Sequence, residues 1–140
     1  MVTCAVSWLA AAVAVEVYGL VFRLAGVPMK AAAITDSKAT AIEPGMFAMG
    51  AFFAVFWGTL ITLAIARYAA RPATTYLWVM LPLAVLSLIG PLGSSHTPTA
   101  TKLMLCGGHV LAAAIIIPAV HRRLRGIAAP APRMEPARSR

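Results

Sequence analysis

The chain has 140 residues, of which 61% are hydrophobic and only 11% are charged. Soluble domains carry about a quarter charged residues, and a domain this small cannot bury so much apolar surface. The composition therefore excludes an ordinary soluble domain and predicts a chain that uses lipid as its apolar solvent. The net charge is +8, and the basic residues flank the apolar runs. They do not form a basic patch interleaved with aromatic residues, so we do not expect nucleic acid as a partner.

The first apolar run covers residues 4–22 and is followed by Arg23 and Pro28. At 1.5 Å per residue it is long enough to cross about 30 Å of hydrocarbon. It lacks a basic leading segment and contains Glu16, so we expect a retained helix and not a cleaved signal peptide.

A polar connection over residues 27–44 comes next, and it has room for a short interfacial helix around residues 30–34. The second apolar run, residues 46–66, follows directly. Gly50, Ala54 and Gly58 recur in it every four residues, which places them on one helix face where another backbone can approach closely. We favour packing within one chain over a homodimer interface, and we keep the dimer as the alternative.

Two further runs cover residues 76–92, with Pro82 inside, and residues 102–120. The chain is therefore predicted to be all-α, an integral membrane bundle of four transmembrane helices over residues 1–125. The tail, residues 126–140, is rich in Ala, Pro and Arg, and is predicted to be a disordered cytoplasmic segment.

An even number of spans puts both termini on one side of the membrane. Eight basic residues lie on that side: Arg67, Arg71, Arg122, Arg123, Arg125, Arg133, Arg138 and Arg140. Four lie on the other: Arg23, Lys30, Lys38 and Lys102. The positive-inside rule then predicts a multi-pass protein of the cell (inner) membrane with both termini in the cytoplasm, and the first five arginines as topology determinants.

Glu16 and His109 are the candidate functional residues inside the predicted spans. A charged group at the centre of a membrane helix costs about 2.5–3.5 kcal/mol by insertion scales, so such residues face a bundle interior or a cavity. Counted from the span ends, the two lie at similar depth, and we hypothesise that they face each other. A Glu–His pair could relay protons, bind a cation or hold two helices together. The structural alternative for Glu16 is a protonated side chain that hydrogen-bonds a neighbouring helix.

Other chemistry has little support in the sequence. No nucleophile-elbow, zinc-protease, P-loop or dinucleotide motif is present, so we expect no enzyme. Cys4 and Cys106 lie in apolar segments without a Cys/His cluster, and no second histidine lies at the depth of His109 to complete a haem site. We therefore expect no metal and no cofactor.

The chain resembles a family of small actinobacterial four-helix membrane proteins that share a domain of unknown function. The segments that carry the resemblance are Trp8-Leu9, Leu24-Ala25-Gly26-Val27, Arg71-Pro72, Leu86-Ser87-Leu88, Gly90-Pro91-Leu92 and Ile117-Pro118. The resemblance covers most of the chain up to Arg125 and implies a four-helix fold without an established activity. That family often has an asparagine where this chain has Glu16, which keeps a polar group at the position.

A second resemblance is local. Residues Ala14-Val15-Glu16-Val17-Tyr18-Gly19 are similar to the first helix of small multidrug resistance transporters, in which an embedded glutamate binds protons and cationic drugs. The long first loop and the missing later aromatic and glycine motifs depart from that family. We therefore expect an integral membrane protein of accessory or structural role, with the lipid bilayer and a possible second copy as partners. The alternative is a proton-coupled small-molecule transporter built around Glu16.

Overall fold

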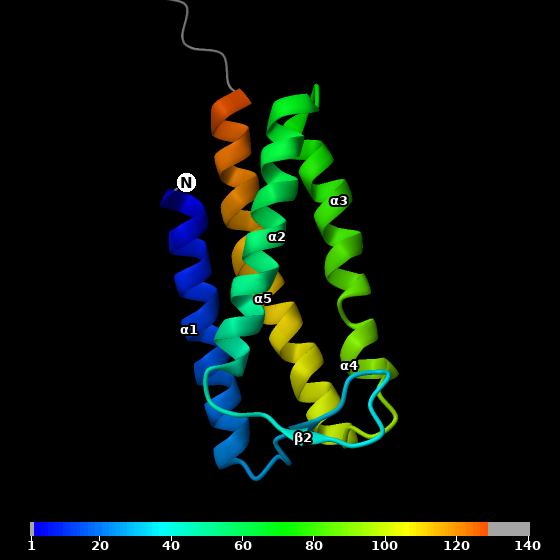
Figure 1. The fold of residues 1–140 in the computed structure, drawn as a ribbon. Coiled ribbons are helices and arrows are strands. Elements are labelled where there is room, and N and C mark those ends of the chain that lie inside the picture. Colours follow the sequence, from blue (N-terminus) through cyan, green and yellow to red (C-terminus); the bar gives the residue numbers. More distant parts are fainter. Residues whose placement is uncertain (1, 129–140) are drawn as a thin grey trace, which may run out of the picture.

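The computed structural model describes residues 2–128, apart from the side chains of residues 2–5, 8, 127 and 128. The chain is mostly helical, as predicted (Figure 1). Its helices are α1 (Val2–Leu24), α2 (Met46–Tyr68), α3 (Pro72–Leu86), α4 (Ile89–Gly93) and α5 (Thr99–Ala128). Two short strands, β1 (Lys30–Ala31) and β2 (Thr40–Ala41), lie in the connection between α1 and α2.

Within the described residues, three helical segments are long and apolar enough to cross a membrane: Met46–Tyr68, Pro72–Gly93 and Thr99–Gly126. They contain the second, third and fourth predicted runs. The first run lies within α1, which has 23 residues. The structure therefore indicates a membrane protein with three candidate spans, and a fourth span through α1 stays a prediction. Residues 126–128 of the predicted tail belong to the end of α5, and the rest of the tail, beyond Ala128, lies outside the described residues.

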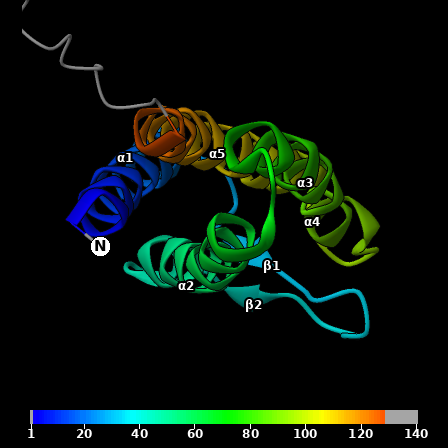
Figure 2. The same cartoon turned by 90° about the horizontal axis from the view of Figure 1, so that it is seen from above.

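The helices pack around α5, which contacts both α1 and α3, while α2 lies against α1 and more loosely against α3 (Figures 1 and 2). Two apolar clusters hold them together. One joins Ala12 and Val15 of α1 to Ala51 of α2. The other joins α2, α3 and α5 near the α2–α3 turn, and consists of Ile65, Tyr76, Ile117, Val120 and Leu124. Many large apolar side chains instead point outward, as lipid-facing helices require.

The connection between α1 and α2 folds as a hairpin, so the short helix predicted around residues 30–34 is wrong. β1 and β2 pair antiparallel, with Lys30 opposite Ala41. The backbone N–H of Ala32 donates to Thr97 Oγ1 at 2.9 Å. A five-residue helix is a poor nucleus on its own, and here strand pairing and Thr97 satisfy the same backbone groups.

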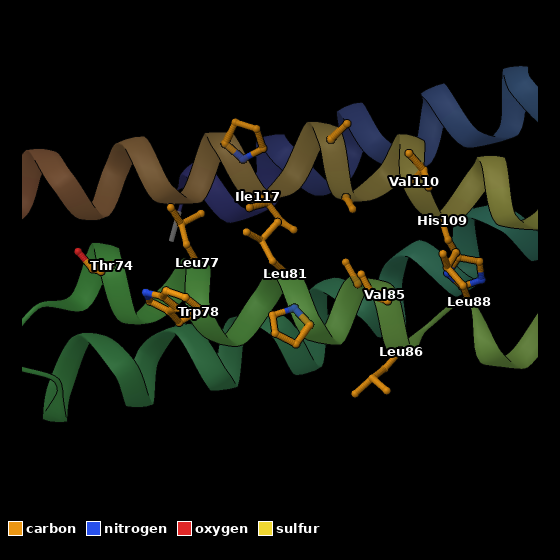
Figure 3. A pocket seen from close by; sticks show the side chains of 15 residues that line it. Thr74, Leu77, Trp78, Leu81, Val85, Leu86, Leu88, His109, Val110 and Ile117 are labelled. Carbon is orange, nitrogen blue, oxygen red and sulfur yellow. The ribbon is translucent and has the colours of Figure 1, made fainter.

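The third predicted run is interrupted between α3 and α4. Pro91 has no N–H to donate to the carbonyl of Ser87, and its ring crowds that carbonyl, so the helix cannot continue smoothly through this point. The Ser87 hydroxyl donates to the Ala84 carbonyl at 2.7 Å. The interruption lies beside the part of α5 that carries His109 (Figure 3).

The two ends of the molecule differ in their basic side chains. The start of α1, the α2–α3 turn and the end of α5 lie at one end, and the hairpin lies at the other (Figure 1). The predicted topology determinants within the described chain gather at the first end and are all exposed: Arg67, Arg71, Arg122, Arg123 and Arg125.

Candidate functional site

The amino end of α2 lies beside α1 and needs hydrogen-bond acceptors. The first N–H groups of a helix have no partner within the helix, and the residue that precedes α2, Gly45, offers no capping side chain. Gly45 has φ 90°, a left-handed conformation that suits glycine. α2 begins at the level of Glu16, which lies about 12 Å from the end of α1 at 1.5 Å per residue. The first turn of α2 therefore lies well inside the helical layer.

Glu16 supplies the missing acceptor. Its Oε1 accepts a hydrogen bond from the backbone N–H of Ala48, the third residue of α2, at 2.8 Å. A capping side chain usually comes from the residue just before the helix, whereas this one comes from a neighbouring helix. A carboxylate at this end also interacts favourably with the helix dipole, typically by about 0.3–1 kcal/mol. Glu16 thus acts as an N-cap for α2, and as an acceptor it needs no proton of its own.

His109 lies at a different place from Glu16. On α5, Gly107 and Gly108 face the Tyr18 ring of α1. The His109 side chain points toward α3 and α4, where it lies close to Leu88 (Figure 3). The expected Glu16–His109 pairing is therefore not formed, and the two candidates belong to separate sites.

Two glycines outside the small-residue stripe of α2, Gly19 and Gly107, pack so closely against a neighbouring helix that they leave no room for a Cβ. The Tyr18 hydroxyl donates to the Met104 carbonyl of α5 at 3.1 Å, and a Cβ on Gly107 would overlap that hydroxyl. A Cβ on Gly19 would lie 2.6 Å from Cε2 of Phe47. The pair Gly107-Gly108 inside an apolar run was the visible clue, but nothing in the sequence identified its partner.

The small-residue stripe on α2, which consists of Gly50, Ala54 and Gly58, contacts another helix at one end only. A Cβ on Gly58 would lie 3.6 Å from Cε of Met80, an ordinary contact with α3. A Cβ on Gly50 would meet nothing within 4 Å, and Ala54 is exposed. Packing within the chain is therefore made at Gly58 and not at Gly50, and the homodimer alternative stays a prediction.

His109 lines three cavities at once. One, of about 320 Å³, lies between α1, α2, α3 and α5. A second, of about 360 Å³, lies under the hairpin, beside Ile34 and Thr97. The third is an open apolar groove of about 960 Å³ between α3 and α5 (Figure 3). We call the first the interior cavity, the second the outer cavity and the third the lateral groove.

The imidazole of His109 has unused hydrogen-bonding capacity. The interior cavity is also lined by hydroxyl groups, but two of them are occupied: Thr62 Oγ1 donates to Gly58 O at 2.6 Å, and Ser87 Oγ donates to Ala84 O. Within residues 2–128, no partner is found for either ring nitrogen of His109. A neutral imidazole offers one donor and one acceptor, so His109, together with the Thr59 hydroxyl of the same lining, can bind the polar group of a ligand.

Metal binding has no support in the described part of the chain, where no three His, Cys, Asp or Glu side chains gather into a group that could hold an ion. The Cys106 thiol is free, and the side chain of Cys4 lies outside the description. The absence of a cofactor stays a prediction.

Comparison with known proteins gives a family and no activity. No curated protein and no solved structure matches the chain. A family model described as a family of unknown function, DUF6069, matches residues 1–126. The match includes all four long helices, the Glu16 cap and the three cavities around His109, and on this basis the chain belongs to the DUF6069 family.

Proposed function

We propose that this protein is a four-span integral membrane protein with a non-enzymatic, accessory or structural role, and with both termini in the cytoplasm. The observation that carries the proposal is the hydrogen bond from Ala48 N–H to Glu16 Oε1. It gives the membrane-embedded carboxylate a structural task, because it completes the first turn of α2. A transporter built around Glu16 would instead need this oxygen to exchange a proton or a cation during each cycle.

Support for α1 as the fourth span comes from its length and its outer face. Its 23 residues extend over about 35 Å, enough for the hydrocarbon core. It lies along α5, its main neighbour (Figure 1). The side of α1 that faces away from the bundle is apolar and exposed, at Val6, Leu9, Val13, Val17 and Leu20.

The proposed topology predicts where a reporter will be found. A reporter fused after Arg125 is expected in the cytoplasm, because the arginines at that end outnumber the basic residues of the hairpin end. The same reporter inserted after Asp36, in the hairpin loop, is expected outside. Protease accessibility in intact cells and in inverted vesicles measures both. An external reporter after Arg125 would contradict the proposed orientation.

The structural role of Glu16 is tested by Glu16→Gln in purified protein reconstituted into vesicles. Glutamine keeps an oxygen that can accept the Ala48 N–H, but it cannot bind and release a proton. We expect neither the wild type nor the variant to show proton-coupled uptake across a panel of cationic compounds, measured with a pH-sensitive dye inside the vesicles.

Uptake by the wild type that Glu16→Gln abolishes would overturn the structural role and establish the transporter. Arg23→Gln serves as the matched control, since it also removes one charge from α1 but lies away from Ala48 and contacts Ile42 O instead.

A further inference from the structure

We propose that the interior cavity around His109 binds a small, largely apolar molecule that carries one uncharged hydrogen-bonding group, such as an aliphatic alcohol. The proposal goes beyond the accessory role, because it assigns a ligand site whose lining includes neither Glu16 nor Ala48. Three features of the cavity carry it: its size, its lining and its access to lipid.

The size of the interior cavity suits a small molecule. Its volume of about 320 Å³ corresponds to roughly ten water volumes of about 30 Å³ each. Ligand sites in proteins start at about 300 Å³, so this cavity lies at the small end of that range. An occupant of about ten non-hydrogen atoms would fill it.

The lining sets the chemical class of the occupant. Apolar side chains dominate the wall, including Met80, Leu83 and Ile116, and they favour an apolar body. The Thr59 hydroxyl and the His109 imidazole are polar groups of this lining without a partner among the described residues, and the one that also lines the lateral groove is the imidazole. It can donate to or accept from a hydroxyl, while a charged group would be costly at this depth. The combination selects an uncharged amphiphile.

Access is from the lipid through the lateral groove. Ala84 of α3 and Ala113 of α5 line both the groove and the interior cavity, as does His109. These three residues and Ile117 form the wall that the groove and the cavity share, and the two alanines are its smallest side chains. Toward the α2–α3 turn, the cluster around Ile65, Tyr76 and Val120 closes the cavity. A molecule dissolved in the bilayer can therefore reach His109 from the side, without passing through a polar end of the bundle.

The test uses photolabelling of the full chain in phosphatidylcholine vesicles, with an octanol that carries an aliphatic diazirine. In the wild type we expect labelling concentrated at the cavity wall, at His109, Ala113 and Ile116, and displaced by excess unlabelled octanol. Mass spectrometry locates the label. His109→Leu is expected to raise the octanol concentration needed for displacement about three- to tenfold, since one hydrogen bond of about 0.5–1.5 kcal/mol is lost.

Three matched variants complete the design. His109→Gln keeps a donor and an acceptor and is expected to retain binding. Ala113→Phe fills the cavity and is expected to abolish displaceable labelling. His121→Leu removes a histidine from the same helix that lines none of the three cavities, and is expected to match the wild type.

If His109→Leu fails to fold, a diazirine probe of the same length without the hydroxyl tests whether the hydrogen bond to His109 contributes to binding. It is expected to bind the wild type about three- to tenfold more weakly than the alcohol. Labelling that excess octanol does not displace, or equal displacement in the wild type and His109→Leu, would overturn the site. Neither result bears on Glu16, because Glu16 and Ala48 are not among the residues that line the interior cavity.

Discussion

Replacing Gly107 with alanine is expected to destabilise the protein by about 1–3 kcal/mol relative to the same change at Gly50, the usual range for overpacking a close contact. The added Cβ would overlap the Tyr18 hydroxyl, which is held by its hydrogen bond to Met104 O. The ring must move, and the hydrogen bond between α1 and α5 must lengthen or break. The interface between α1 and α5 is the most extensive helix contact in the bundle, so the substitution strains the main packing contact of α1.

Gly50→Ala is the matched control for this prediction. Both glycines lie inside helices, so both variants gain the same helix propensity, about 1 kcal/mol, and this gain cancels in the comparison. At Gly50 the new methyl group meets nothing within 4 Å. Unfolding of the two variants in mixed detergent, followed by circular dichroism, gives the difference. Equal stabilities would show that Tyr18 is not packed tightly against Gly107.

Replacing Glu16 with leucine is expected to leave the protein about 1–3 kcal/mol less stable than replacing it with glutamine, because the Ala48 N–H then has no acceptor in an apolar setting. Comparison with glutamine is needed because both changes remove a carboxyl group from α1, which we propose to span the membrane. That removal alone is favourable, so comparison of leucine with the wild type would mix two opposite effects.

Hydrogen exchange provides a second measurement for the same prediction. The amide of Ala48 should exchange slowly in the wild type and in Glu16→Gln, and faster in Glu16→Leu. The amide of Ile65, which lies in the apolar cluster near the other end of α2, serves as the internal reference and should not change. If leucine and glutamine gave the same stability and the same exchange at Ala48, Glu16 would not be the cap of α2.

The helices could be predicted because their signal is local. An apolar run of about 20 residues has to form its hydrogen bonds internally in lipid, which makes a helix almost the sole choice. Each predicted run lies inside a helix or, for the third, inside α3 and α4. Because the predicted runs alternate in direction, they also placed Arg67 and Arg71 at the same end of the molecule as the arginines at the end of α5, where the structure has them (Figure 1).

The site could not be predicted because it depends on helix rotation. The depth of a residue along its helix axis can be counted from the ends of the apolar run. This count placed Glu16 and His109 at similar depths. Each residue turns by about 100° on a helix of 3.6 residues per turn, so an unknown rotation decides which neighbour a side chain meets. Gly107 faces α1, whereas His109 points to α3 and α4. The hydrogen bond from Ala48 to Glu16 could not be predicted either, because it depends on where α2 begins relative to α1.

The bond between Glu16 and Ala48 also bears on how the chain enters the membrane. It joins α1 to α2, the next long helix in the chain, and its donor belongs to a helix end that has no capping side chain before it. If α1 spans the membrane as proposed, it is synthesised before α2 and offers that helix an acceptor during insertion, where an uncapped helix end in hydrocarbon would be costly. The order of synthesis then works in the protein's favour: α1 and α2 can form a stable helical pair before α3 and α5 have been translated.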